Sequence, residues 1–290
     1  MKGIVITKLY GGLGNQMFQY AAAKSIAIEA RKDFRIDTRS LTQNKERQFR
    51  LAHAGLSIPE ASEADLHPFF NETFTAKFRR VLGRPKYKIF KQNEQSYFEF
   101  NPEIARTRTF GVYLDGYWQN PLYFEKTSST LRNDFSLDAA KLNHPELLKD
   151  ISDKNSVAVH VRRGDFLNPE TNKIHGTLPL EYYKQAVEMI SGSVRDPFFY
   201  FFSDDIAWCR TNFTGVNFIF ASNPSHSEVD DLCLMKSCKH QIIANSTFSW
   251  WGAWLNTNPD KIVIAPKNWF AYTPWNLRAA PLVPLPWIRI

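Results

Sequence analysis

The sequence predicts an α/β protein made of two units, each with a largely parallel sheet. Short runs rich in valine, isoleucine and phenylalanine alternate with helical stretches, most regularly in the second half of the chain. The 290 residues, 43% of them hydrophobic and 22% charged, suffice for one large or two compact domains and exclude a disordered or coiled-coil chain. A polar stretch at 142–154 separates two such patterns. We therefore expect domains at 1–145 and 146–290.

The first unit opens with a strand, a glycine-rich loop and a helix. Residues 3–7 form an apolar run suited to a buried strand, and Gly11-Gly12-Leu13-Gly14-Asn15-Gln16 follows as a tight loop. A helix is expected from Met17 to Ala30, because apolar and small residues recur there at spacings of three and four. A second strand is expected at 34–37. Residues 41–149 show weaker patterns, and no element is assigned there.

The second unit has five short apolar runs that are suited to strands buried on both faces. They lie at 157–161, 198–202, 216–220, 241–244 and 261–265. Helices are expected at 180–190, 228–238 and 247–255, the first of them opened by Pro179. This alternation predicts a parallel sheet with right-handed crossovers and helices on both faces. The proline-rich end, with Pro281, Pro284 and Pro286, is expected to be an irregular tail.

Run lengths, the N-terminal residues and the cysteine count narrow the class of protein. No apolar run reaches the roughly 18 residues that a membrane span needs, and the N-terminus has no signal-peptide pattern. Three cysteines are an odd number, which indicates free thiols and a reducing compartment. We therefore expect a cytoplasmic protein.

The formal net charge of +7 suggests an anionic partner. Much of the excess lies in one basic run from Lys77 to Lys91, with no acidic residue between Glu72 and Glu94. Aromatic and aliphatic residues interleave with it, a pattern that can contact an anionic membrane surface or nucleic acid. A solvated basic face is the simpler alternative. No nucleic-acid recognition motif accompanies the run, so we expect no nucleic-acid partner.

Three polar clusters follow predicted strands, where ligands of parallel sheets bind. His160-Val161-Arg162-Arg163-Gly164-Asp165 ends the first strand of the second unit, Ser203-Asp204-Asp205 the next, and Asn245-Ser246-Thr247-Phe248-Ser249 the fourth. Two guanidinium groups favour an oxyanion such as a diphosphate, whose charge grows as its bond to a sugar breaks. A structural salt bridge to Asp165 is the alternative.

The other polar clusters permit more than one interpretation. The turn at 245–249 can bind an anion through backbone N–H groups and hydroxyls, or can serve only as a helix cap. Of the adjacent acids Asp204 and Asp205, one is expected to form a hydrogen bond or cap a helix and the other to contact a ligand. The loop around Gly12, Gly14, Asn15 and Gln16 matches a dinucleotide fingerprint only in part, because Met17 stands where the third glycine would be. It can approach a ligand or be a simple turn. No residue spacing favours a metal site.

Taken together, these motifs resemble a known family. Gly11-Gly12-Leu13-Gly14-Asn15-Gln16-Met17-Phe18-Gln19-Tyr20-Ala21, His160-Val161-Arg162-Arg163-Gly164-Asp165 and Asn245-Ser246-Thr247-Phe248-Ser249-Trp250-Trp251-Gly252-Ala253 are similar to successive motifs of the bacterial α1,2-fucosyltransferases. Gly116-Tyr117-Trp118-Gln119 and Phe202-Ser203-Asp204-Asp205 are similar to weaker ones. The resemblance spans residue 3 to about 270.

The resemblance implies a GT-B architecture, with two facing Rossmann-like domains. It implies metal-independent, inverting transfer of L-fucose from GDP-β-L-fucose to the 2-hydroxyl of a terminal galactose. The first domain would then take the acceptor and the second GDP-fucose. Catalytic roles would fall to Arg162, Arg163 and Asp165. His160, Asp204, Asp205, Asn245, Ser246, Thr247, Phe248 and Ser249 would contact the donor, and Gly12, Gly14, Asn15 and Gln16 would face the cleft.

The residues leave three further points open. By residue type, Asp165, His175 or Asp115 could act as a general base. The basic run could dock the enzyme at the inner face of a membrane. A non-catalytic glycan-binding protein or a nucleic-acid-binding protein remains an alternative to the enzyme.

Overall fold

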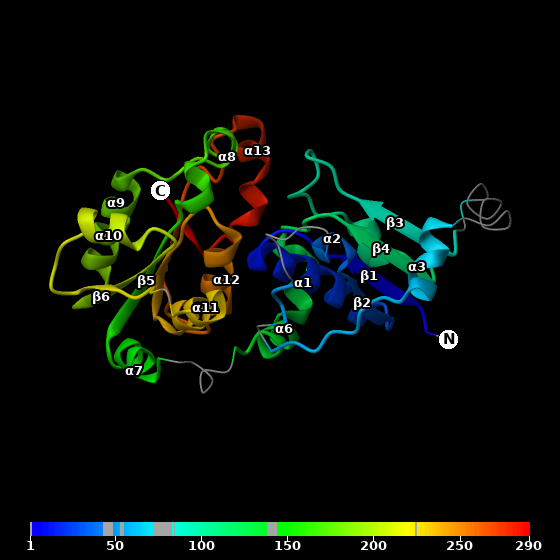
Figure 1. The fold of residues 1–290 in the computed structure, drawn as a ribbon, viewed down its shortest axis with the longest axis horizontal. Coiled ribbons are helices and arrows are strands. Elements are labelled where there is room, and N and C mark those ends of the chain that lie inside the picture. Colours follow the sequence, from blue (N-terminus) through cyan, green and yellow to red (C-terminus); the bar gives the residue numbers. More distant parts are fainter. Residues whose placement is uncertain are drawn as a thin grey trace. The chain divides into compact units, whose positions relative to one another are not determined.

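The computed structural model describes residues 2–42, 49–52, 55–71, 83, 85–137, 144–223 and 225–290. The chain divides into two compact units, Met1–Phe135 and Ser136–Ile290, and each is considered by itself. Each unit is built around its own sheet (Figure 1). Four of the seven basic residues in the run at 77–91 (Lys77, Arg79, Arg80 and Arg84) lie outside the described residues.

The first unit has a four-stranded parallel sheet in the order β2-β1-β4-β3. The strands are β1 (Ile4–Lys8), β2 (Asp33–Asp37), β3 (Tyr87–Lys91) and β4 (Gly111–Asp115). The helices are α1 (Leu13–Glu29), α2 (Arg39–Thr42), α3 (Glu63–Phe70), α5 (Pro102–Arg106) and α6 (Ser128–Asp134), with short turns η1 (Pro121–Tyr123) and η2 (Glu125–Thr127).

Strand alternation decides which helix covers which face of this sheet. Ile6 and Tyr113 pack with Leu66 and Phe69 of α3 on one face. The residues beside them in each strand point the other way, and α1 contacts β1 there. A run of three alanines at 21–23 is fully buried and lets this helix approach the strands closely.

The second unit has a six-stranded parallel sheet in the order β10-β9-β8-β5-β6-β7. The strands are β5 (Asn155–Val161), β6 (Pro197–Ser203), β7 (Phe218–Phe220), β8 (His240–Ile242), β9 (Val263–Ala265) and β10 (Ile288–Arg289). The helices are α7 (Pro145–Asp153), α8 (Pro169–His175), α9 (Leu180–Ser193), α10 (Ile206–Asn212), α11 (Glu228–Ser237), α12 (Thr247–Leu255) and α13 (Thr273–Arg278), with turns η4 (Gly164–Leu167) and η5 (Ala280–Leu282).

Both faces of the second sheet are covered, as a sheet of apolar strands requires. Val157, Val159 and Val161 lie in one core with residues of α9 and α10. Ala158 and Tyr200 point to the opposite face and pack with residues of α7 and α11. The expectation of an α/β protein with two parallel sheets is confirmed.

Strand order places a switch point in each sheet. In the second unit the chain runs from β5 to β6 and β7 on one side, then returns to β8, β9 and β10 on the other. This is the order of a Rossmann sheet, whose ligands bind between the two central strands at their carboxyl ends. In the first unit the corresponding gap lies between β1 and β4.

Several elements differ from the sequence-based expectations. Helix α1 begins at Leu13 with Gly12 as its N-cap, so most of the expected loop is the first turn of the helix. The polar stretch at 142–154 holds helix α7, because Pro145 takes the first-turn position that proline favours. The proline-rich tail ends in a short strand, β10, paired with β9. Strand β7 begins at Phe218, since Val216 is fully exposed.

Two further observations concern the class of protein. Cys209, Cys233 and Cys238 are buried thiols. Within the described ranges, no helix is both long and apolar enough to cross a membrane.

Candidate functional site

Arg162 lies at the switch point of the second sheet, directly after β5. Its Nη2 is 2.5 Å from Oδ1 of Asp165, and its Nη1 is 2.6 Å from Oδ2 of Asp204. The guanidinium also lies 5.4 Å from the centre of the Phe166 ring. One third of the side chain stays exposed (33%), so the group is held in place but can reach a ligand.

Arg163 is more enclosed than Arg162. Its Nε donates to Oδ2 of Asp205 at 2.9 Å, and its guanidinium stacks 4.4 Å from the Trp208 ring centre. This hydrogen bond, opposed in part by burial, lowers the pKa of Asp205. The other oxygen of Asp205 caps α10 by accepting from the backbone N–H of Trp208 at 3.1 Å. Arg163 therefore fastens the loop after β5 to the loop after β6.

Asp204 completes this connection and explains the glycine in the motif. Its Oδ1 accepts from the backbone N–H of Arg163 at 2.9 Å, while Oδ2 pairs with Arg162. A Cβ on Gly164 would lie 2.5 Å from Oδ2 of Asp204. Glycine at position 164 therefore leaves room for the Asp204 carboxylate, which holds the side chain of Arg162 and the backbone of Arg163.

His160 lies on β5 shortly before Arg162 and Arg163, which form the arginine-containing rim of the sheet. It is 5% exposed on β5, and its ring lies 5.5 Å from Phe248. Burial, with Arg162 as a second cause, lowers the pKa of His160 to about 3. Its Nδ1 has no hydrogen-bond partner within the described residues. The imidazole is therefore neutral and contributes no positive charge to the rim.

The turn between β8 and α12 divides into buried and accessible residues. Asn245 is buried, and its amide donates to the backbone carbonyls of His175, Gly176 and Trp269. Ser249 is also buried, and Ser246 caps α12 by accepting from the N–H of Phe248.

Three residues of this turn are partly exposed: Ser246, Thr247 and Phe248. They follow β8, which is the neighbour of β5 in the sheet, and Arg162 follows β5.

In the first unit, buried amides hold the glycine-rich segment. Gln16 Nε2 donates to the carbonyl of Gly11, which adopts a φ of +82° that favours glycine. Gln19 accepts from the N–H of Tyr10 and donates to its carbonyl. Asn15 Oδ1 accepts from Nε2 of Gln119 at 2.9 Å. Gln19 was not among the predicted cleft residues, although it lies three residues after Gln16 on the same helix.

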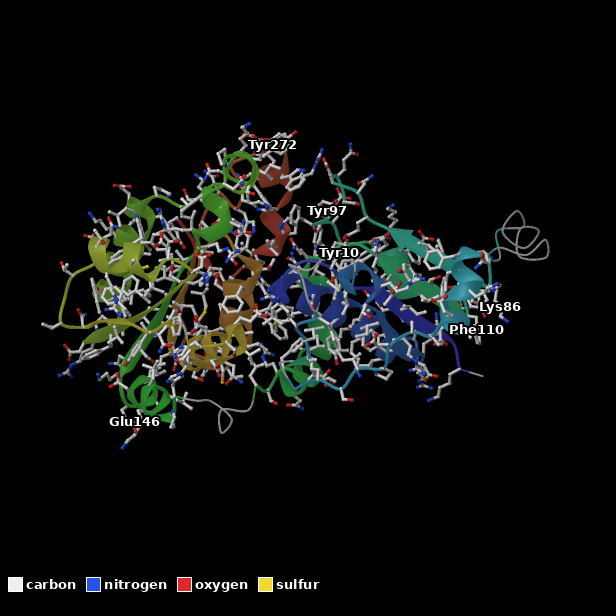
Figure 2. The ribbon with its side chains drawn as sticks, in the orientation of Figure 1. Tyr10, Lys86, Tyr97, Phe110, Glu146 and Tyr272 are labelled. Atoms are coloured by element: carbon white, nitrogen blue, oxygen red, sulfur yellow. The ribbon has the colours of Figure 1, made fainter. Side chains whose placement is uncertain are left out.

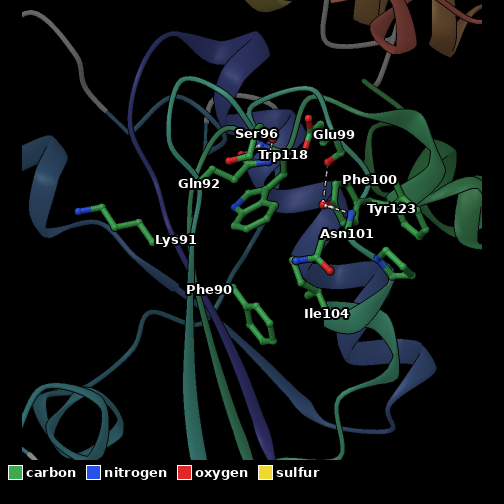
Figure 3. Close-up of a pocket in the computed structure, with 11 residues that line it drawn as sticks. Phe90, Lys91, Gln92, Ser96, Glu99, Phe100, Asn101, Ile104, Trp118 and Tyr123 are labelled. Carbon is green, nitrogen blue, oxygen red and sulfur yellow. Dashed lines mark hydrogen bonds between the residues drawn. The ribbon is translucent and has the colours of Figure 1, made fainter. Parts of the chain in front are cut away.

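A pocket of about 220 Å³ lies next to β3 and the loop that follows it (Figure 3). Phe90, Ile104 and Trp118 contribute apolar surface. Tyr123 borders the pocket, and its hydroxyl accepts from the N–H of Asn101 and donates to the carbonyl of Glu99. The lining is mixed, because Lys91 and Glu99 border the pocket together with polar and apolar residues.

The three candidate bases have different surroundings. Asp165 pairs with Arg162, and the His175 ring stacks on Phe166 with centroids 4.9 Å apart. Asp115, the last residue of β4, is 3.5 Å from Nζ of Lys8. Among the described residues, no group of three or more His, Cys, Asp or Glu side chains could hold a metal ion.

Comparison with known proteins places the chain in a particular family. The family model described as "Glycosyl transferase family 11" matches residues 4–276. The chain belongs to this family, and the resemblance derived from the motifs is confirmed.

Similar proteins include an "Alpha-1,2-colitosyltransferase" of Escherichia coli, 33% identical over 99% of both chains. An "O-antigen biosynthesis glycosyltransferase WbnK" of the same species is 32% identical over 91% of this chain and 94% of the relative. A pig (Sus scrofa) "Galactoside alpha-(1,2)-fucosyltransferase 2" is 25% identical over 88% of this chain and 70% of the relative. Among solved structures, fucosyltransferase NodZ from Bradyrhizobium is 12% identical with a TM-score of 0.47, over 87% of this chain and 93% of that one.

Proposed function

We propose that this glycosyltransferase moves L-fucose from GDP-β-L-fucose to the 2-hydroxyl of a terminal galactose, forming an α1,2 linkage with inversion. Family membership and the names of the pig and bacterial relatives support the α1,2 linkage. The observation that carries the donor assignment is Arg162, a partly exposed guanidinium at the switch point of a Rossmann-type sheet.

In this proposal the diphosphate of the donor displaces one carboxylate from the guanidinium of Arg162. Arg162 is held by Asp165 and Asp204, and phosphate oxygens replace one of these partners when GDP-fucose binds. Ser246 and Thr247, at the start of α12, add hydroxyl and backbone donors. Arg163 keeps the loop in position through Asp205.

The reaction is a single displacement. The oxygen of the galactose 2-hydroxyl attacks the anomeric carbon of fucose from the face opposite the diphosphate, the bond from that carbon to the diphosphate oxygen breaks, and the hydroxyl proton leaves to a base or water. Arg162 stabilises the negative charge that grows on the departing GDP. The second unit would bind the donor, and the first unit would bind the acceptor.

A second donor is favoured by one specific observation. The E. coli relative that is 33% identical over 99% of the chain is named a colitosyltransferase. Colitose is L-fucose without its 3-hydroxyl, so the two donors differ by a single group on the sugar. The ratio of kcat/KM for GDP-fucose and GDP-colitose decides between them.

The proposal is tested by measuring GDP release from each donor with a panel of galactosides, with and without EDTA. We expect release that needs a galactoside and that EDTA leaves unchanged. No release with any acceptor, combined with no affinity for GDP, would overturn the proposal and favour a glycan-binding protein. Oligonucleotide binding with a steep salt dependence would favour the nucleic-acid alternative.

Arg162→Ala tests the role of the exposed guanidinium. We expect kcat to fall by ~10²-fold or more, because charge on the leaving group loses its stabilisation. Arg195→Ala is the matched control, since Arg195 is an exposed arginine of the same unit whose side chain pairs with its neighbour Asp196. An Arg162→Ala enzyme within a few-fold of the control would refute the assignment.

A further inference from the structure

The switch point of the first sheet carries a second set of side chains suited to a ligand. β1 and β4 are neighbours and run parallel, so their carboxyl ends meet at one edge. Lys8 ends β1 and is followed two residues later by Tyr10. Asp115 ends β4 and is followed two residues later by Tyr117. Open parallel sheets bind ligands at this position.

Three tyrosines from separate segments gather there. The rings of Tyr10 and Tyr117 are 4.8 Å apart and those of Tyr97 and Tyr117 are 5.1 Å apart, both edge to face. All three side chains are partly exposed. Figure 2 shows Tyr10 and Tyr97 close together in this view, well away from Phe110, which precedes β4.

Two carboxylates, Asp115 and Glu94, and the ammonium group of Lys8 act on these rings. Asp115 is 3.5 Å from Nζ of Lys8, and that ammonium also lies 5.7 Å from the ring centre of Tyr10. Burial, followed by the neighbouring Tyr117 and Asp115, raises the pKa of Tyr10. Its phenol therefore stays neutral and can donate a hydrogen bond. The carboxylates outnumber the ammonium group, so this position disfavours an anion and suits a neutral polar ligand.

Buried glutamines hold the tyrosines in place. Gln19 is fully buried and pairs with both backbone groups of Tyr10. Gln92 accepts from the N–H of Trp118 at 2.9 Å and donates to the carbonyl of Ser96, beside Tyr97. A Cβ on Gly116 would lie 2.5 Å from Oε1 of Gln92, so the glycine next to Tyr117 makes this contact possible. Such pre-ordering lowers the entropy lost when a ligand binds.

The backbone at this edge is also strained. Trp118 has a φ of +54°, which a bulky residue other than glycine seldom adopts. Strain of this kind persists only where the surroundings impose it, and it concentrates at binding and catalytic sites. The segment from Asp115 to Gln119 therefore holds a fixed conformation at a cost.

We propose that Tyr10, Tyr97, Tyr117 and Asp115 form a subsite, the tyrosine subsite, for a pyranose ring of the acceptor glycan. A pyranoside has an apolar C–H face that packs on aromatic rings and hydroxyl groups that donate to a carboxylate. This inference rests on the proposed function, because it assigns the acceptor of that reaction to these four side chains. A nucleobase would also stack on the rings, and the test below separates the two ligands.

The test compares acceptor and donor parameters in three variants. Tyr97→Leu, Tyr10→Leu and Asp115→Asn should each raise the KM for lactose about tenfold. Each variant loses one ring contact or one charge-assisted hydrogen bond, and this loss causes the change. GDP affinity by calorimetry should stay within twofold of wild type. Tyr87→Leu is the matched control, since Tyr87 is a partly exposed tyrosine at the opposite end of β3 and packs on Phe69 and Phe110.

The nearly isosteric Asp115→Asn variant keeps the test informative if a leucine variant does not fold. Saturation-transfer NMR with methyl β-D-galactopyranoside in the presence of GDP adds a reading apart from turnover, and Tyr97→Leu should remove the signal. Lactose KM values equal to that of the control, or a loss confined to GDP affinity, would overturn the tyrosine subsite. Failure of the proposed function would instead appear as no transfer by the wild-type enzyme to any galactoside.

Discussion

Arg162 and Arg163 are adjacent in sequence but have different surroundings. Arg162 pairs with two carboxylates and keeps a third of its side chain exposed, whereas Arg163 is enclosed by Asp205 and the Trp208 ring. Both carry a permanent charge, so the difference lies in access. We therefore propose that Arg162 contacts the ligand and that Arg163 positions the loop.

His160 gives a prediction about stability at the residue scale. The unfolded chain takes up a proton on this imidazole below about pH 6.5, whereas the folded chain does so only near pH 3. Between these values the unfolded state binds more protons, so the free energy of unfolding falls as pH falls, by about 1.4 kcal/mol per pH unit from this group.

Urea titrations of wild type and His160→Gln between pH 7 and 5 measure this contribution. The decrease for His160→Gln should be shallower, while the exposed control His67→Gln should follow wild type. Equal pH dependence in wild type and His160→Gln would mean that the imidazole is not held neutral by burial.

At the scale of elements, loops after parallel strands are joined by side chains from the next loop. Asp205 caps α10 and also accepts a hydrogen bond from Arg163. One carboxylate therefore stabilises both the start of the helix and the loop after β5. Asn245 plays a similar part by connecting the turn after β8 to the end of α8 and to Trp269. Both residues were expected to contact the donor, and their roles as ligand contacts stay predictions.

Asp205→Ala tests this double role. Loss of the cap should lower the free energy of unfolding by about 1 kcal/mol, and release of Arg163 should weaken GDP affinity several-fold. Ser62→Ala is the matched control, because Ser62 caps α3 in the first unit with a capping box. The control should lose similar stability and bind GDP normally. Normal GDP affinity in Asp205→Ala would contradict the positioning role of Arg163.

At the scale of the whole molecule, each sheet has its own switch point with its own chemistry. The second sheet presents a guanidinium and hydroxyl groups, which suit a diphosphate. The first presents three phenol rings and an ion pair, which suit a neutral sugar. A transferase needs both kinds of site, and the proposed donor and acceptor account for each.

The net charge of the whole chain gives a prediction that does not depend on any one residue. A formal charge of +7 should attract the protein to vesicles that contain phosphatidylglycerol at low ionic strength, and binding should weaken as salt shortens the range of the attraction. Vesicle sedimentation at 20 and 300 mM salt measures this, with neutral phosphatidylcholine vesicles as the control. No binding at low salt would remove membrane docking by the basic run.

The pattern of apolar runs was enough to predict the fold class and the arginine-containing rim. Buried parallel strands appear as apolar runs of several residues, and their ends identify Arg162 without knowledge of any partner. The run at β5 was therefore visible. Strand β3 was not predicted, because two lysines interrupt the apolar residues of this five-residue strand at the sheet edge.

Which side chains meet became clear from the three-dimensional fold. Asp204 pairs with Arg162 across 42 positions of sequence, and Tyr10, Tyr97 and Tyr117 come from three separate segments. Periodic patterns report neighbours a few residues apart, whereas these contacts depend on strand order and on how close two loops can approach. Glycines such as Gly116 and Gly164 permit that approach, and their purpose becomes evident only when Gln92 and Asp204 are seen in the space that a Cβ would fill.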